Sequence, residues 1–142
     1  MVSLKNLSLL SLLLLLLACR KTTTDTTVIS TTNKMKGPIT LYVQALHHTY
    51  PIAHIRVHYK LLCNAYPGSD TSLYDYHATA DVNGYVRFDS LLYGNGYIYA
   101  EGFDPVVQEQ VKGNSGLLLT TNNVSSDKQA EKIIYVSENA NH

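Results

Sequence analysis

The chain has 142 residues, and its eleven lysines and arginines balance eleven aspartates and glutamates. Proteins that bind nucleic acid need an excess of basic side chains to neutralise phosphates, so the balanced charge argues against a nucleic-acid partner. At about 100–200 residues per domain, this length allows a single domain with one hydrophobic core.

The first 18 residues have the composition of a secretory signal peptide. Lys5 supplies a positive charge, and the stretch from Leu7 to Leu17 is apolar apart from two serines. A membrane-spanning helix needs about 20 apolar residues, and this stretch is shorter. We therefore predict a helical signal peptide over residues 1–18, which is not a permanent membrane span.

Cys19 directly follows this leader. The run Leu16-Leu17-Ala18-Cys19 resembles the lipobox of bacterial lipoproteins. In such proteins the leader is cut off, and the cysteine carries a diacylglyceryl thioether and usually an N-acyl chain such as palmitate. The resemblance implies lipid attachment at Cys19, and two or more acyl chains would hold the protein stably in the lipid bilayer. An ordinary secretory signal with an incidental cysteine is the alternative.

The resemblance to lipoproteins also implies a location in the cell envelope. Arg20 follows the cysteine, whereas an aspartate there resembles the inner-membrane retention signal of many Gram-negative bacteria. We therefore expect the outer membrane, with periplasmic and surface-facing orientations both open. Residues 19–37 hold seven threonines between Thr22 and Thr32 and little that could build a core. They are predicted to form a disordered, Thr-rich tether.

Residues 38–137 have the pattern of a β-domain. Hydrophobic and polar residues alternate from Ile39 to Ala45, which indicates a half-buried strand. A second strand is predicted after the Tyr50-Pro51 break, with its hydrophobic phase inward and its other phase facing water. The inward residues are Ile55, Val57, Tyr59 and Leu61, and the outward residues are His54, Arg56, His58 and Lys60.

Further strands are predicted along the rest of the domain, with turns at Asn83-Gly84, Gly94–Gly96 and Gly113–Gly116. About seven short strands without helical periodicity predict an all-β fold, an antiparallel β-sandwich, followed by a tail at residues 138–142. The predicted strands are Leu73–Ala80, Tyr85–Phe88, Tyr97–Ala100, Val106–Val111 (or a short helix), Leu117–Thr121 and Lys132–Val136.

Two segments resemble transthyretin-like domains. Pro51-Ile52-Ala53 and the alternation from Ile55 to Lys60 are similar to their second-strand region. The run from Thr79 to Phe88, followed by Leu91, Gly94 and Tyr97, is similar to a pattern shared with carboxypeptidase-regulatory-like sandwiches. The resemblance spans residues 39 to 104 and implies a transthyretin-like or immunoglobulin-like sandwich, but it does not imply a function.

Some transthyretin-like proteins are hydroxyisourate hydrolases, and the sequence departs from their pattern. Tyr42 stands where a histidine is expected, and the chain from Tyr135 to His142 lacks the Tyr-Arg-Gly-Ser ending. No nucleophile elbow, phosphate loop or zinc-protease motif occurs either. We therefore predict no catalytic residues, no cofactor and no enzymatic activity, and we keep a small hydrolase as a remote alternative.

Five of the six histidines fall between His47 and His77 and raise the question of a metal site. His54 and His58 share a strand face, but at about 3.3 Å per residue they lie about 13 Å apart, too far to bind one ion. His47 and His48 are adjacent and are expected to point to opposite faces of a strand. The sequence therefore predicts surface histidines and no metal site.

The two cysteines and the eleven tyrosines complete the inventory. With Cys19 lipidated, no disulfide is expected within the mature chain, and Cys63 is expected to be a small buried residue. A tyrosine ladder on one sheet is predicted, either as ordinary cross-strand pairing or as a face that binds a partner or a glycan. Its members are Tyr42, Tyr74, Tyr76, Tyr85, Tyr97 and Tyr99.

Together these features predict a membrane-anchored, extracytoplasmic binding or assembly module. A structural accessory component of the cell envelope is the alternative. The expected partners are the bilayer, through acylated Cys19, and an envelope protein, a peptide or a glycan.

Overall fold

The computed structural model describes residues 37–138. The predicted signal helix over residues 1–18, residues 19–36 of the tether and residues 139–142 of the tail lie outside the described residues. The described part of the chain is all-β, as predicted, and Glu138 belongs to its last strand and not to the tail. None of its segments forms a helix that is long and apolar enough to cross a membrane.

Eight strands and one short 3₁₀ helix, η1, make up this part of the chain. Their bounds are β1 Ile39–His47, β2 Tyr50–Pro51, β3 Arg56–Leu61, η1 Thr71–Leu73, β4 Tyr76–Thr79, β5 Tyr85–Leu91, β6 Gly94–Asp104, β7 Glu109–Leu119 and β8 Gln129–Glu138.

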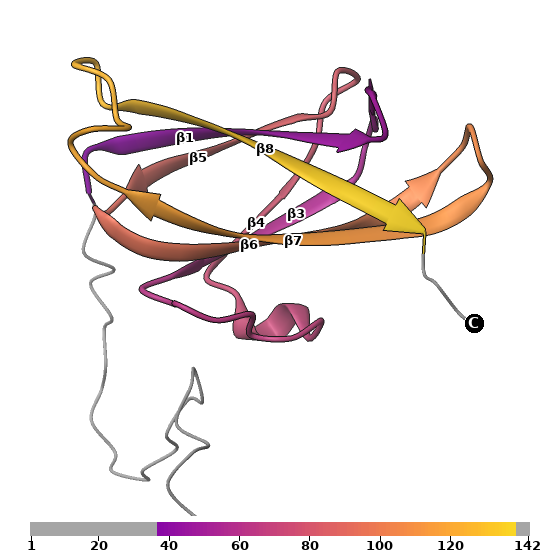
Figure 1. Ribbon diagram of the computed structural model, residues 1–142, viewed down its shortest axis with the longest axis horizontal. Helices are drawn as coiled ribbons and strands as arrows, with labels where there is room; N and C mark the ends of the chain where they lie inside the picture. The colour runs from indigo at the N-terminus through magenta and orange to yellow at the C-terminus, as the bar shows by residue number, and fades with distance from the viewer. Residues whose placement is uncertain (1–36, 139–142) are drawn as a thin grey trace, which may run out of the picture. The chain divides into compact units, whose positions relative to one another are not determined.

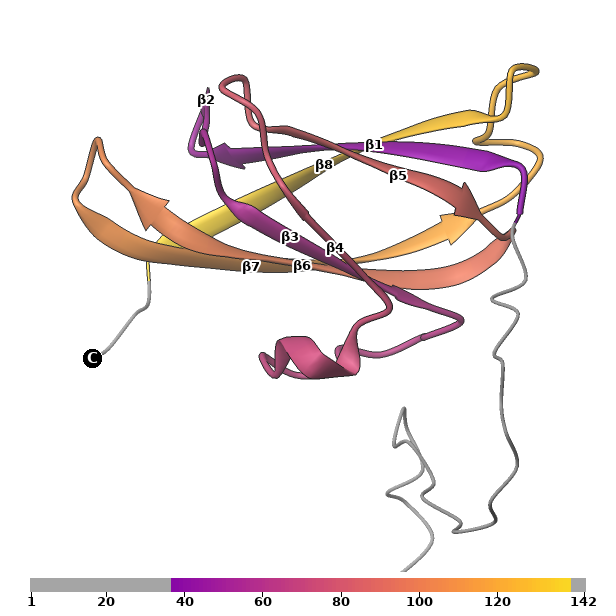
Figure 2. The same ribbon diagram turned by 180° about the vertical axis from the view of Figure 1, so that it is seen from behind.

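The strands form one curled, mixed sheet that doubles back into two facing layers (Figures 1 and 2). In the first layer β1 pairs with β2, β5 and β8, and in the second the order is β4-β3-β6-β7. Strand β8 runs parallel to β1 and then crosses to β7, which it meets at Val111 and Lys112 (Figure 1).

The parallel β1–β8 pair means that an antiparallel sandwich is not confirmed. Alternation along a strand reports which face is buried, and it is the same whether the neighbouring strand runs parallel or antiparallel. The sequence pattern therefore carried no information about this pairing between the two ends of the domain.

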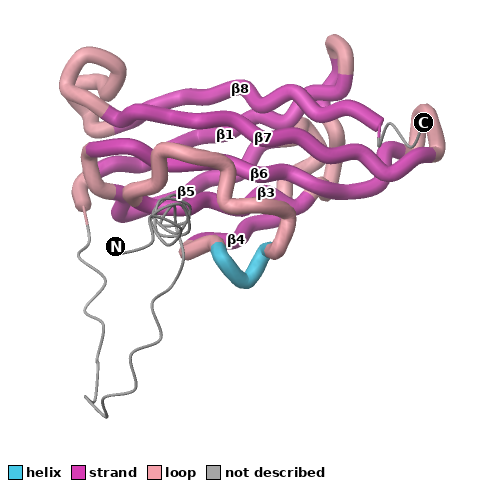
Figure 3. Tube along the Cα trace, turned by 60° about the horizontal axis from the view of Figure 1, so that its bottom comes forward, coloured by secondary structure: helices cyan, strands magenta, loops and turns pink. Residues whose placement is uncertain are grey.

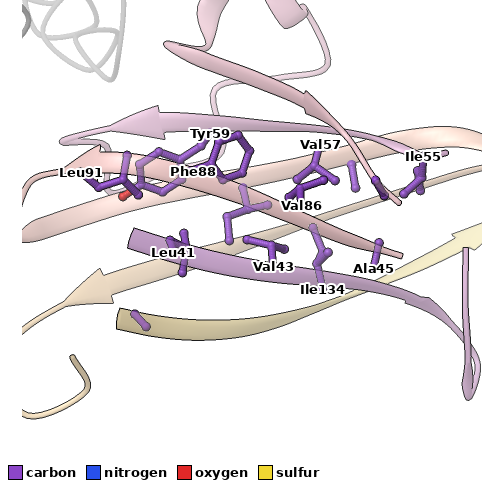
Figure 4. Close-up of a cluster of buried hydrophobic side chains, with 14 of the residues drawn as sticks. Leu41, Val43, Ala45, Ile55, Val57, Tyr59, Val86, Phe88, Leu91 and Ile134 are labelled. Carbon is purple, nitrogen blue, oxygen red and sulfur yellow. The ribbon is translucent and has the colours of Figure 1, made fainter. Parts of the chain in front are cut away.

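The hydrophobic core lies between the two layers (Figure 4). The inward phase of β1 is fully buried, which confirms the strand predicted there: Ile39, Leu41, Val43 and Ala45 are each 0% exposed. Together with residues of the neighbouring strands β5 and β8, they face Val57 and Tyr59 of β3 across the core. Burying one such aliphatic side chain contributes roughly 1.5–3 kcal/mol, so this core is the main source of stability.

Two of the predicted turns lie inside strands. The glycines at Gly94–Gly96 belong to β6, and those at Gly113–Gly116 belong to β7. These glycines do not reverse the chain but let neighbouring groups pack closely against the strand. A Cβ atom on Gly96, for example, would overlap the Tyr59 side chain. A Cβ atom on Gly113 would likewise overlap the carbonyl oxygen of Tyr135, where β8 passes over β7.

Three other local predictions were inexact. The strand expected at Leu73–Ala80 is reduced to β4 and is preceded by η1. Val106 lies in the turn between β6 and β7, in neither a helix nor a strand. Cys63 is buried, as predicted, but it is disulfide-bonded, contrary to the expectation for a lipidated chain.

Replacing Gly113 with Ala is expected to lower the free energy of unfolding by about 1–3 kcal/mol, because the new methyl group forces β8 away from β7. Gly116→Ala in the same strand is the control, since its Cβ would meet nothing closer than 3.6 Å. The control is expected to change stability by less than about 1 kcal/mol. Urea denaturation measures both, and equal effects would contradict this role of Gly113.

Candidate functional site

The loop formed by residues 62–75 covers the outer face of the second layer (Figures 1 and 3). Beneath it the rings of Tyr74 and His58 both stack on Tyr99, with ring centroids 5.9 Å apart in each pair. All three residues are at most 5% exposed. His58 was predicted to face water, and this was wrong because the loop covers the outward phase of β3 at that point.

His58 also contacts a second histidine on the neighbouring strand. Its Nδ1 lies 2.7 Å from Nδ1 of His77, so one ring donates a proton and the other accepts it. Burial lowers the pKa of His58, and the nearby His77 and Arg56 lower it further against the opposing effect of Glu101. This hydrogen bond joins β3 to β4 beneath the loop.

A surface groove of about 520 Å³ opens beside this loop, where β8 meets β7. Tyr66, 41% exposed, comes from the loop, and Tyr135, 63% exposed, comes from β8. The other lining residues are Ser69, Tyr99, Lys112, Gly113, Asn114 and Ser137. The lining therefore consists of aromatic rings, hydroxyl and amide groups and one ammonium group, with no carboxylate or imidazole.

The predicted tyrosine ladder is divided among three places. Tyr74, Tyr97 and Tyr99 do gather on the outer face of the second layer, and they are joined there by Tyr66. Tyr76 instead packs toward the core, against Tyr59 and Phe88. The remaining two, Tyr42 and Tyr85, line a different groove over the first layer. Tyr66 was missed because it lies in a loop, where strand periodicity gives no signal.

A second group of polar residues lies where the ends of β1, β6 and β8 meet. His47 and Asp104 are each 1% exposed, and Nδ1 of His47 is 2.6 Å from Oδ2 of Asp104. The Tyr50 hydroxyl donates to the same oxygen at 2.6 Å, and the Val106 amide donates to Oδ1 at 2.8 Å. We call His47, Tyr50 and Asp104 the buried triad.

His48 and Glu138 lie directly beside the buried triad. His48 was expected to point away from His47, but its φ of 52° takes the chain out of strand geometry. The two rings come within 4.3 Å of each other, centroid to centroid. Oε1 of Glu138 is 3.2 Å from Nε2 of His47 and 3.9 Å from Nε2 of His48. The structure thus brings together residues that strand alternation would separate.

The remaining candidate residues stay apart. His54 is exposed, but it lies in the turn before β3, with φ of 61°, and not on the strand face that it was expected to share with His58. Tyr42 lies on the first layer with Arg87 over its ring. Cys19 lies outside the described residues.

Comparisons with known proteins give a similarity of structure only. No family model and no curated protein matches the sequence. The structure is similar to a crystal structure of the major pilin subunit of Bacillus cereus, with 9% sequence identity and a TM-score of 0.48. The match covers 72% of this chain and 30% of the pilin chain, so this chain spans less than a third of the pilin's length.

The lowered pKa of His58 predicts a pH-dependent stability. Unfolded histidine titrates at about 6.5, so just below that pH the unfolded chain binds more protons than the folded chain does. The free energy of unfolding is therefore expected to fall as the pH drops from 7.5 to about 5.5. Urea titrations across this range measure the slope.

His58→Phe keeps an aromatic ring against Tyr74 and Tyr99 and is expected to reduce that slope. His54→Asn is the matched control, because His54 is exposed and Asn tolerates its φ of 61°. The control should keep the full slope. An unchanged slope in His58→Phe would show that His58 is not the residue responsible.

Proposed function

We propose that the protein is a lipid-anchored, extracytoplasmic binding module without catalytic activity, and that its ligand site is the groove between the loop and β8. The observation that carries this proposal is the pair Tyr66 and Tyr135, both exposed in one groove of about 520 Å³. Tyrosine suits a binding surface because its ring packs while its hydroxyl stays hydrated.

The chemistry of the groove favours a carbohydrate ligand. An exposed tyrosine ring offers a flat apolar face to the C–H groups of a sugar, and the hydroxyl and amide groups of Ser69, Asn114 and Ser137 can bind sugar hydroxyls. Lys112 is the only charged residue of the lining, which suits a neutral or an acidic saccharide. The lining offers no pair of groups for acid–base catalysis, which supports binding without turnover.

The anchor is proposed from the sequence. Cys19 carries the lipid, residues 19–37 form the tether, and the outer membrane is the preferred location, with its facing side open. Because the chain has only two cysteines, a lipidated Cys19 requires that any disulfide of Cys63 is made to a second chain. This arrangement would hold the groove near the membrane surface.

For the fold, we propose that the two layers are a variant of the transthyretin-like sandwich. The acidic turn of the shared motif supports this, because Asp81 accepts hydrogen bonds from the amides of Asn83 and Tyr85 and so closes the β4–β5 connection. Gly84, with φ of 74°, supplies the left-handed residue that this turn needs.

Tyr66→Ala and Tyr135→Ala are each expected to weaken saccharide binding about tenfold or more, because each removes an aromatic face from the groove. The measurement is binding of the purified protein to neutral and acidic oligosaccharides on an array, followed by calorimetry on the strongest ligand. Tyr85→Ala is the control, since Tyr85 is 45% exposed but lies on the first layer.

The alternative, a structural accessory role in the envelope, gives the opposite pattern. A photo-crosslinker placed at position 66 or 135 would then capture one recurrent envelope protein, and no oligosaccharide would bind. Saccharide binding that all three alanine variants retain would also contradict the proposed site.

Cys19→Ala is expected to move the protein from the membrane fraction to the soluble fraction, because it removes the thioether that carries the acyl chains. Intact mass spectrometry of the wild-type protein should show a chain that begins at Cys19 and carries acyl groups. A disulfide that used Cys19 would leave no sulfur for a thioether. An unacylated chain with an oxidised Cys19 would therefore contradict the lipid anchor.

A further inference from the structure

We propose that His47, His48 and Glu138 form a binding site for a divalent transition metal, with Zn²⁺ as the ion that this donor set fits best. The three residues come from the end of β1, the turn after it and the end of β8. The site is separate from the groove assigned to the saccharide, and it stands whether or not that function is correct.

The spacing of the ligand atoms is close to what a metal requires. Oε1 of Glu138 lies 3.2 Å from Nε2 of His47 and 3.9 Å from Nε2 of His48. One ligand atom from each of the three residues lies within 4.8 Å of the other two. Tetrahedral zinc with bonds of about 2.0–2.1 Å places its ligand atoms about 3.3 Å apart. His48 is 68% exposed, so its ring can rotate to bring Nε2 closer to the other two ligand atoms without disturbing the core.

The observation that points most directly to a cation is the environment of Nε2 of His47. This nitrogen is buried and has no hydrogen-bond partner, although Glu138 lies 3.2 Å away. Because Nδ1–H of His47 donates to Asp104, neutral His47 presents the lone pair of Nε2 toward the Glu138 carboxylate. Two acceptors then face each other at 3.2 Å, and the His47 nitrogen is buried, which is unfavourable unless a cation lies between them.

Asp104 and Tyr50 hold His47 in the tautomer and ring orientation that leave Nε2 available to a metal ion. The Asp104 carboxylate accepts hydrogen bonds from Tyr50, His47 and the Val106 amide, and these fix its position beside the His47 ring. A carboxylate that accepts the far N–H of a ligating histidine is the usual second layer of a metal site, because it fixes the tautomer and the ring orientation.

The donor set selects among metals. Two imidazoles and one carboxylate match zinc sites that keep a further coordination position open, and Cu²⁺ and Ni²⁺ accept the same donors. Calcium and magnesium prefer oxygen ligands and should bind weakly here. The open position would face solvent, since Glu138 and His48 are 37% and 68% exposed.

A protonated His47 held between Asp104 and Glu138 is the competing explanation for the same geometry. It also gives Nε2 a partner, through a proton instead of a metal ion. The two explanations differ in measurable ways. A metal ion also bonds to His48 and displaces protons from its ligands when it binds, whereas a protonated His47 involves neither a bond to His48 nor a release of protons.

The test is calorimetric titration of ZnCl₂ into the purified, chelator-treated full chain at pH 7.5, with CaCl₂ and MgCl₂ as comparison ions. We expect binding of one zinc ion per chain, at least tenfold weaker in His48→Asn and in Glu138→Gln. Both variants change exposed side chains, so folding is retained, and Asn tolerates the φ of 52° at position 48. Asp104→Asn tests the positioning role and should weaken zinc binding about 10–100-fold.

His54→Asn is the control and should leave zinc affinity unchanged. As a second readout, the ¹⁵N signal of His47 Nε2 should shift to a metal-bound value when zinc is added. Absence of zinc binding, or equal zinc affinity in wild type, His48→Asn and Glu138→Gln, would overturn the proposal. A doubly protonated His47 at pH 7.5 that zinc does not displace would establish the imidazolium instead.

Discussion

The crossing of β8 from the first layer to the second is the constraint on which both candidate sites depend. Strand β8 pairs with β1 along most of its length and then meets β7 at Val111 and Lys112. Contact this close is possible because position 113 is glycine, since any Cβ there would overlap the backbone of β8. The crossing places Tyr135 and Ser137 at the groove, and Glu138 beside His47.

The domain buries polar groups at positions where apolar residues would serve stability better. An ionised Asp104 at 1% exposure must be matched by donors, and the structure supplies them from Tyr50, His47 and the Val106 amide. This arrangement leaves Nε2 of His47 without a hydrogen bond. His58 also has a buried nitrogen without a hydrogen bond, but its ring packs among stacked tyrosines and against His77. The contrast supports a metal at His47 and a packing role for His58.

The individual strands were largely predictable, whereas the functional surfaces were predictable only in part. The buried phase of β1 and the inward residues Val57 and Tyr59 follow from alternation, which is a local property of a half-buried strand. The glycines of β6 and β7 were misread as turns because glycine marks both chain reversal and close packing. Tyrosine composition indicated an aromatic face, but only the long loop placed Tyr66 beside the β7–β8 junction.

The sequence by itself determined the all-β class and the core residues of β1 and β3, because each depends on neighbouring residues in the chain. Tertiary structure decided the parallel pairing of β1 with β8, the cover over His58 and the meeting of His47, Asp104 and Glu138. Those contacts join residues far apart in sequence, and alternation along a strand gives a side chain's face but not its neighbour across the sheet. Even the contact between the adjacent rings of His47 and His48 could not be predicted from the sequence, because the left-handed backbone of His48 turns its ring toward His47.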